Sequence, residues 1–90
     1  MSTGLKQDIS IGQNLKVLRK KANLSQREAS AQMEILKIPM TEDILAKIEQ
    51  GCYSVRISAL LAMKQIYDVN SFDVFFEGLS LETDSVTIES

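Results

Sequence analysis

The sequence predicts an all-α domain built from five helices. Apolar residues recur at three- and four-residue intervals in successive segments, as expected for helices with one buried face. Residues that favour helix ends separate these segments. The 90 residues include one proline and four glycines, and 44% are hydrophobic, which is typical of a globular chain. We place the domain at residues 9–77 and predict that residues 1–8 and 78–90 are flexible termini.

The first predicted helix runs from Ile11 to a stop near Ala22 and Asn23. Its apolar residues follow the i, i+4, i+7, i+11 spacing of one helix face and are Ile11, Leu15, Leu18 and Ala22. Residues 19–21 are Arg-Lys-Lys, in the last turn, where the helix dipole favours positive charge. The second helix begins after Ser25, which forms a capping box with Glu28, and is predicted to end near Met33 or Glu34.

The third predicted helix covers residues 42–50, between Thr41 as its N-cap and Gly51 as its left-handed terminator. Met40 and Leu45 have the spacing of a hydrophobic staple around the cap. The side chains expected to face inward are Ile44, Leu45 and Ile48. A fourth helix is predicted over residues 56–67, and Ser71 caps a short fifth helix that ends at Phe76. We expect the nearby aromatic side chains to serve the core rather than an interface: Tyr67, Phe72, Phe75 and Phe76.

Charge is unevenly distributed along the chain. The formal net charge is −2, from ten basic and twelve acidic residues. Residues 77–90 hold four of the acidic residues and none of the basic ones, so the rest of the chain carries ten basic against eight acidic residues. The sequence therefore predicts a mildly basic domain with an acidic C-terminal tail. This balance permits binding to nucleic acid without requiring it.

The residues needed for several other functions are missing. The chain has no histidine, and Cys52 is its only cysteine. A disulfide, a thiolate metal site and a histidine general base are therefore excluded within one chain. We expect no enzyme activity, no cofactor and no metal. Because no apolar run reaches about 18 residues and no secretory signal is recognisable, we expect a cytoplasmic protein that does not contact a membrane.

The order and spacing of these segments resemble the Cro/repressor-type (Xre-like, lambda repressor-like) helix-turn-helix family. The resemblance covers about residues 11–76, and its strength lies in the joint order of the matching residues. These are Ile11-Gly12, Leu15 to Arg19, Leu24-Ser25-Gln26, Ile48 to Gly51, Leu60-Leu61 and Tyr67-Asp68-Val69. The resemblance implies a DNA-binding transcriptional regulator, repressor-like, that acts as a homodimer on a two-fold operator. No small-molecule ligand is expected.

The resemblance also implies a set of DNA contacts. The third helix would enter the major groove, with base contacts from Glu42, Asp43 and Lys47. Four residues fall where the family contacts phosphate: Ser25, Gln26, Gln50 and Cys52. The charges of Arg27 and Lys37 make them additional candidates for phosphate contacts. Arg19 and Glu49 match a pair that the family buries as a structural salt bridge.

The sequence departs from the family pattern in the length of one turn and in the acidity of the third predicted helix, and this acidity, with the acidic tail, leaves a second function open. The segment from Met33 to Thr41 is about five residues longer than the usual turn. The carboxylates of Glu42 and Asp43 stand where many family members have amides or hydroxyls. Such carboxylates either accept a hydrogen bond from a cytosine amino group or only stabilise the helix dipole. The alternative function is a helix-turn-helix scaffold that binds a protein, as an antitoxin-like adaptor does, with weak or no DNA binding.

Overall fold

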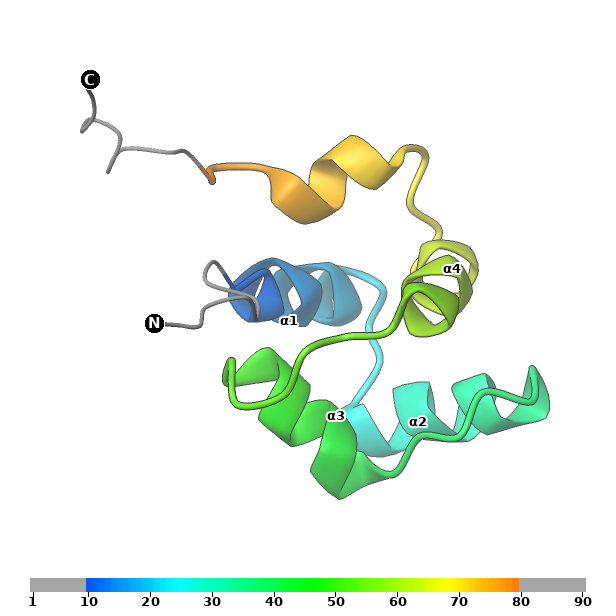
Figure 1. Ribbon diagram of the computed structural model, residues 1–90. Helices are drawn as coiled ribbons and strands as arrows, with labels where there is room; N and C mark the ends of the chain where they lie inside the picture. Colours follow the sequence, from blue (N-terminus) through cyan, green and yellow to red (C-terminus); the bar gives the residue numbers. More distant parts are fainter. Residues whose placement is uncertain (1–9, 80–90) are drawn as a thin grey trace, which may run out of the picture.

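The computed structural model describes residues 10–79, which form four α-helices and one short 3-10 helix (Figure 1). The elements are α1 (Gly12–Lys21), α2 (Gln26–Ile35), α3 (Glu42–Glu49), α4 (Ile57–Ile66) and η1 (Phe72–Phe76). No strand occurs in this part of the chain, so the all-helical prediction is confirmed. The expected fifth helix is a single 3-10 segment. The predicted flexible residues 1–8 and most of the acidic tail lie outside the described residues.

Local capping signals set the starts of α2 and α3. At α2, the Glu28 backbone N–H donates to Ser25 Oγ at 3.0 Å, and the Ser25 N–H donates to Glu28 Oε1 at 2.8 Å. The predicted capping box is therefore confirmed. At α3, Thr41 Oγ1 accepts a hydrogen bond from the Ile44 N–H at 3.1 Å. Each cap satisfies one of the amide groups that the first turn of a helix leaves without a partner.

Left-handed residues end the helices. Gly51 has φ +85° and follows α3, as the sequence predicts. Asn23, Lys37 and Asp68 take the same region of backbone space after α1, α2 and α4. Helix α2 ends at Ile35, one or two residues later than predicted, because the Leu36 N–H still donates to the carbonyl oxygens of the preceding turn. The turn at Lys37 then reverses the chain toward α3.

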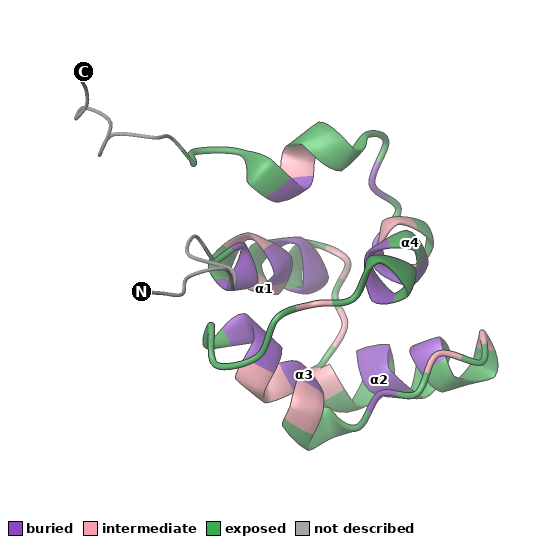
Figure 2. Cartoon of the chain, in the orientation of Figure 1, coloured by how far each residue is buried: buried purple, intermediate pink, exposed green. Residues whose placement is uncertain are grey.

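The core lies where the inner faces of the four α-helices meet, as the buried segments in Figure 2 show. Its fully buried side chains come from every helix: Leu15, Met33, Leu45, Met63 and Phe75. Three predicted core residues differ from expectation. Ile44 is only half-buried, and Phe72 and Phe76 are exposed, because the 3-10 helix turns only Phe75 fully inward.

Helix η1 is fixed to α1 by a side chain. Asn14 Nδ2 donates to the carbonyl oxygens of Phe75 and Glu77, both at 2.9 Å. Helix η1 is therefore held in place by burial of the Phe75 ring and by two hydrogen bonds to its backbone oxygens. Such bonds hold a short 3-10 helix that has little stability of its own.

Helices α1 and α3 approach closely at Gly12. A Cβ atom built on Gly12 would lie 2.5 Å from the carbonyl oxygens of Ile48 and Glu49. The contacting atoms belong to the backbone of α3, so they have no side-chain freedom to move aside. Glycine at this position lets the N-terminus of α1 rest on the C-terminal turn of α3.

Tyr67 is a buried residue whose hydroxyl group has no hydrogen-bond partner among residues 10–79. Its side chain is 5% exposed, at the end of α4. Burial raises the pKa of Tyr67 well above its ordinary value, with a further increase from Glu49 and an opposing effect of Arg19. The folded protein therefore holds this phenol neutral at pH values where an unfolded chain would ionise it.

We expect Tyr67→Phe to raise the free energy of unfolding by about 1–2 kcal/mol at pH 7, because it removes an unpaired buried hydroxyl group. For wild type, the raised pKa means that the folded state keeps its proton while the unfolded state loses it above pH about 10. Stability should therefore fall above that pH by at most about 1.4 kcal/mol per pH unit from this group. Urea unfolding between pH 7 and 11 tests this. A variant with the same alkaline slope as wild type would contradict it.

Candidate nucleic-acid interface

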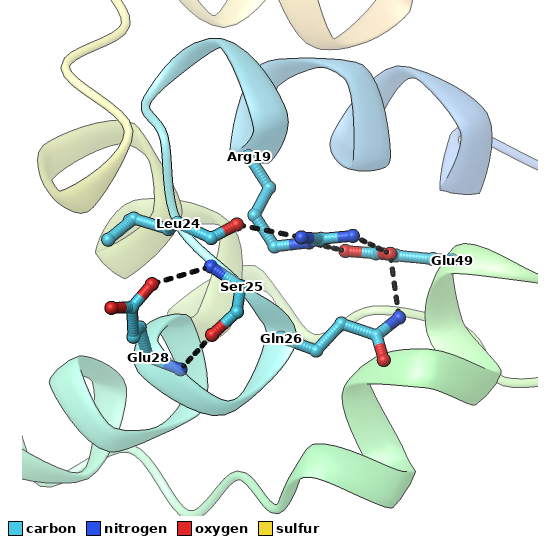
Figure 3. A network of polar contacts seen from close by, with 6 residues as sticks. All are labelled: Arg19, Leu24, Ser25, Gln26, Glu28 and Glu49. Carbon is cyan, nitrogen blue, oxygen red and sulfur yellow. Dashed lines mark hydrogen bonds and ion pairs between the residues drawn. The ribbon is translucent and has the colours of Figure 1, made fainter.

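A buried polar network joins α1, α2 and α3 (Figure 3). Arg19 Nε and Nη2 donate to the two carboxylate oxygens of Glu49, at 2.7 and 3.0 Å. Arg19 Nη1 donates to the Leu24 carbonyl oxygen at 2.7 Å, in the connection to α2. The Arg19 and Glu49 side chains are 6% and 2% exposed. The hydrogen bonds with Glu49 raise the pKa of Arg19 in spite of its burial, so the guanidinium group stays charged.

Gln26 belongs to the same network. Its Nε2 atom donates to Glu49 Oε1 at 3.0 Å, which ties the first turn of α2 to the last turn of α3 (Figure 3). A side-chain amide has two N–H donors and one acceptor oxygen, and here one donor is committed. A phosphate contact by Gln26 would have to use the second donor. The residue is half-buried and so remains partly accessible.

The outward face of α3 carries the predicted base-contact residues. Glu42 and Asp43 are exposed in the first turn, and Lys47 lies one turn further along. Lys47 Nζ is 3.4 Å from Asp43 Oδ2 and 5.4 Å from the centre of the Tyr53 ring. The hydrogen bond with Asp43 raises the pKa of Lys47. The only cation of α3 is thus already paired with a carboxylate on its own helix.

The predicted phosphate-contact residues fall into three separate places. Residues 25–27 form the first turn of α2, with the Ser25 hydroxyl engaged in the capping box. Gln50 and Cys52 are exposed on either side of Gly51, where Cys52 Sγ lies 4.0 Å from Gln50 Oε1. Lys37 is exposed just after the C-terminal end of α2, the opposite end from residues 25–27 and about 15 Å away along the helix axis.

Two residues that the sequence did not indicate lie beside α3, where both line a cavity with Ile44 and Ile48. Tyr53, in the loop after α3, supplies the ring over which the Lys47 ammonium group lies. Arg56 is the N-cap residue of α4, exposed and making no side-chain cap hydrogen bond. An aromatic residue shortly after the glycine stop of α3 is the one signal that would have drawn attention to Tyr53. Nothing in the sequence around Arg56 indicates its place beside α3, because its neighbours in space come from other segments.

Comparisons of the chain with protein-family models, with curated proteins and with solved structures find no match. Within residues 10–79, no group of three or more metal-binding side chains could hold a metal ion. None of the helices in this part of the chain has the length and apolar character needed to cross a membrane. The interpretation of function therefore depends on the residues described above and on their geometry.

Proposed function

We propose that α2 and α3 form a helix-turn-helix unit that binds double-stranded DNA. The observation that carries the proposal is the two-sided character of α3. Its inner face buries Leu45, Ile48 and Glu49 against α1 and α2, while Glu42, Asp43 and Lys47 remain on the outer face. A short helix held rigidly on its inner side, with a polar outer side, suits insertion into a major groove.

Within that class, the chain is proposed to be a Cro/repressor-type (Xre-like) transcriptional regulator. The buried contact between Arg19 and Glu49 supports this narrower assignment, because it links the helices that the resemblance pairs. Helix α3 reads bases, and the exposed start of α2 lies along the phosphate backbone. The carboxylate of Glu42 accepts a hydrogen bond from a cytosine amino group, which is the base edge that suits it. The regulator acts at a promoter, either by occluding the promoter or by recruiting other proteins to it.

The direct test is selection of bound duplexes from a random pool at moderate salt. An enriched palindrome, whose half-sites are about one helical turn apart, is the expected result. Affinity for that duplex should fall steeply as salt increases. A folded protein that binds no duplex even at low salt would overturn the proposal.

Substitutions at the Asp43–Lys47 pair are expected to change DNA affinity in opposite directions. Lys47→Ala removes a cation and should weaken operator binding about tenfold or more, and lower the salt slope by about one if the contact is to phosphate. Asp43→Asn preserves shape, removes a repulsive charge and frees Lys47 from its 3.4 Å partner, so it should tighten binding at low salt. Fluorescence anisotropy over a salt series measures both. Affinities that stay unchanged in both variants would exclude Asp43 and Lys47 from the interface.

A homodimer is proposed to form through the exposed apolar residues of α4 and η1. Ile57 and Leu61 lie one turn apart on α4 and are 72% and 55% exposed. Phe72 and Phe76 are exposed on η1, and Lys64 Nζ lies 5.5 Å from the centre of the Phe72 ring. Large apolar side chains exposed on both elements are typical of interaction surfaces. A two-fold dimer presents one α3 to each half-site.

We expect Leu61→Lys to convert the dimer to a monomer while the fold is retained, because Leu61 is exposed and contributes little to the core. Sedimentation equilibrium measures the change in mass, and circular dichroism checks the helix content. The matched control is Val17→Lys, at an exposed apolar residue of α1, which should leave the dimer intact. Dissociation by Val17→Lys alone would place the interface on α1 instead.

A protein-binding adaptor is the second candidate, and the acidity of α3 favours it. With Lys47 paired to Asp43, the first two turns of α3 present an excess of negative charge through Glu42. DNA is a polyanion and would be repelled by this surface, whereas a basic protein partner would be attracted. Failure to select any duplex, together with a folded protein, would favour this second function.

A further inference from the structure

A cavity of about 590 Å³ lies between α3 and the start of α4. Its floor is apolar and comes from the long α2–α3 connection, from α3 and from α4: Ile38, Met40, Ile44, Ile48 and Ala59. Met40, Ile48 and Ala59 are core residues, so the floor is part of the rigid interior. The volume falls in the range of about 300–1,000 Å³ that is usual for small-molecule sites. The connection between α2 and α3, which the sequence marks as unusually long, supplies Ile38, Pro39 and Met40 to the lining.

The mouth of this cavity is polar and positively charged. Its remaining lining includes Cys52, Tyr53, Ser54, Arg56 and Ser58. Arg56 is the only charged residue among all those that line the cavity. The ion pairs between described residues are Arg19–Glu49 and Lys47–Asp43, so the Arg56 guanidinium group has no carboxylate partner in this part of the chain. A guanidinium group binds a planar carboxylate through two parallel hydrogen bonds.

We propose that this cavity binds a small amphiphilic carboxylate, with its hydrocarbon part on the apolar floor and its carboxylate at Arg56. Charge complementarity selects this occupant, because an uncharged apolar molecule would leave the one cation of the site unused, and a bare anion would leave the floor empty. The inference goes beyond the proposed function and does not depend on DNA binding. Because Ile44 and Ile48 belong to α3, an occupant of the cavity touches the inner side of the helix whose outer side carries the proposed base contacts.

The test uses octanoate as the probe and the full chain as the protein, followed by chemical-shift mapping of backbone amides. Octanoate should cause saturable shifts at the residues that line the cavity. Octan-1-ol, with the same chain and no charge, should bind about tenfold more weakly, as expected for loss of a charge-assisted hydrogen bond. Inorganic phosphate should cause no comparable shifts, because it has no apolar part.

Two variants separate the charge of the site from access to its interior. Arg56→Gln should weaken octanoate about tenfold and leave octan-1-ol unchanged; Arg56 is exposed and makes no cap hydrogen bond, so the fold should be retained. Ser54→Trp, at an exposed loop residue of the mouth, should weaken both probes by obstructing entry. The matched control Lys20→Gln removes an exposed charge of α1 that is not part of the lining, and should leave octanoate affinity within about twofold.

Four results would overturn the proposal. Equal affinity for octanoate and octan-1-ol, or an unchanged octanoate affinity in Arg56→Gln, would remove the role of the carboxylate. If inorganic phosphate changed the chemical shifts of the lining residues as much as octanoate does, the site would be no more than an exposed cation. Shifts of the lining residues that follow protein concentration without any probe would assign the cavity to a second copy of the chain.

Discussion

Glu49→Ala is expected to lower the free energy of unfolding by about 3–5 kcal/mol. The substitution leaves the Arg19 guanidinium group buried and charged, with only the Leu24 carbonyl oxygen as a partner. It also removes the acceptor for Gln26 and so loosens α2 from α3. A domain of this size has only a few kcal/mol of stability, so a large unfolded population is expected at 37 °C. Urea unfolding monitored by circular dichroism measures the loss.

Two controls identify burial as the cause. Asp43→Ala breaks the exposed pair with Lys47 and should change stability by less than about 1 kcal/mol. The double variant Arg19→Met with Glu49→Leu removes both charges and should recover much of the loss, because apolar residues of similar volume often replace a buried ion pair without cost. A loss below about 1 kcal/mol in Glu49→Ala would show that the Arg19 charge is accommodated elsewhere.

Gly12→Ala is expected to destabilise the domain by about 1–3 kcal/mol, as overpacking of a tight contact usually does. The added methyl group would lie 2.5 Å from backbone oxygens of α3, so α1 and α3 must separate. The sign of this change in stability is informative. Alanine is the better helix former by about 1 kcal/mol, so the same substitution would stabilise a helix position without a close neighbour. Thermal unfolding, with Gln13→Ala as the exposed neighbouring control, measures the effect. A more stable Gly12→Ala variant would contradict the close approach described here.

The helices could be predicted closely because their ends depend on local chemistry. Ser25 with Glu28, Thr41 and Gly51 each act on backbone groups within four residues, so the sequence alone carries the information. The same reasoning could not separate Phe75, which is fully buried, from Phe76, which is exposed. That difference arises when the 3-10 segment settles on α1, which lies about sixty residues earlier in the chain.

The candidate site could be predicted less completely than the helices. The spacing of Asp43 and Lys47 is that of an i, i+4 pair, so the sequence contains the information that the cation of α3 meets a carboxylate of its own helix. The inward hydrogen bond of Gln26 and the position of Tyr53 depend on how three helices meet, which periodicity does not specify. The cavity beside Arg56 likewise exists only when the α2–α3 and α3–α4 connections are brought together.

The two hydrogen bonds from Asn14 to η1 have a consequence for how the protein folds during synthesis. They join residues that are 61 and 63 positions apart, near the two ends of the described chain. Helix α1 leaves the ribosome first, yet its Asn14 side chain must wait for Phe75 and Glu77 to emerge before it meets its partners. Contacts between such distant positions are slow to form, since a long loop has to close first. Completion of the domain is therefore expected to wait until Phe75 and Glu77 have emerged, after all four α-helices have been synthesised.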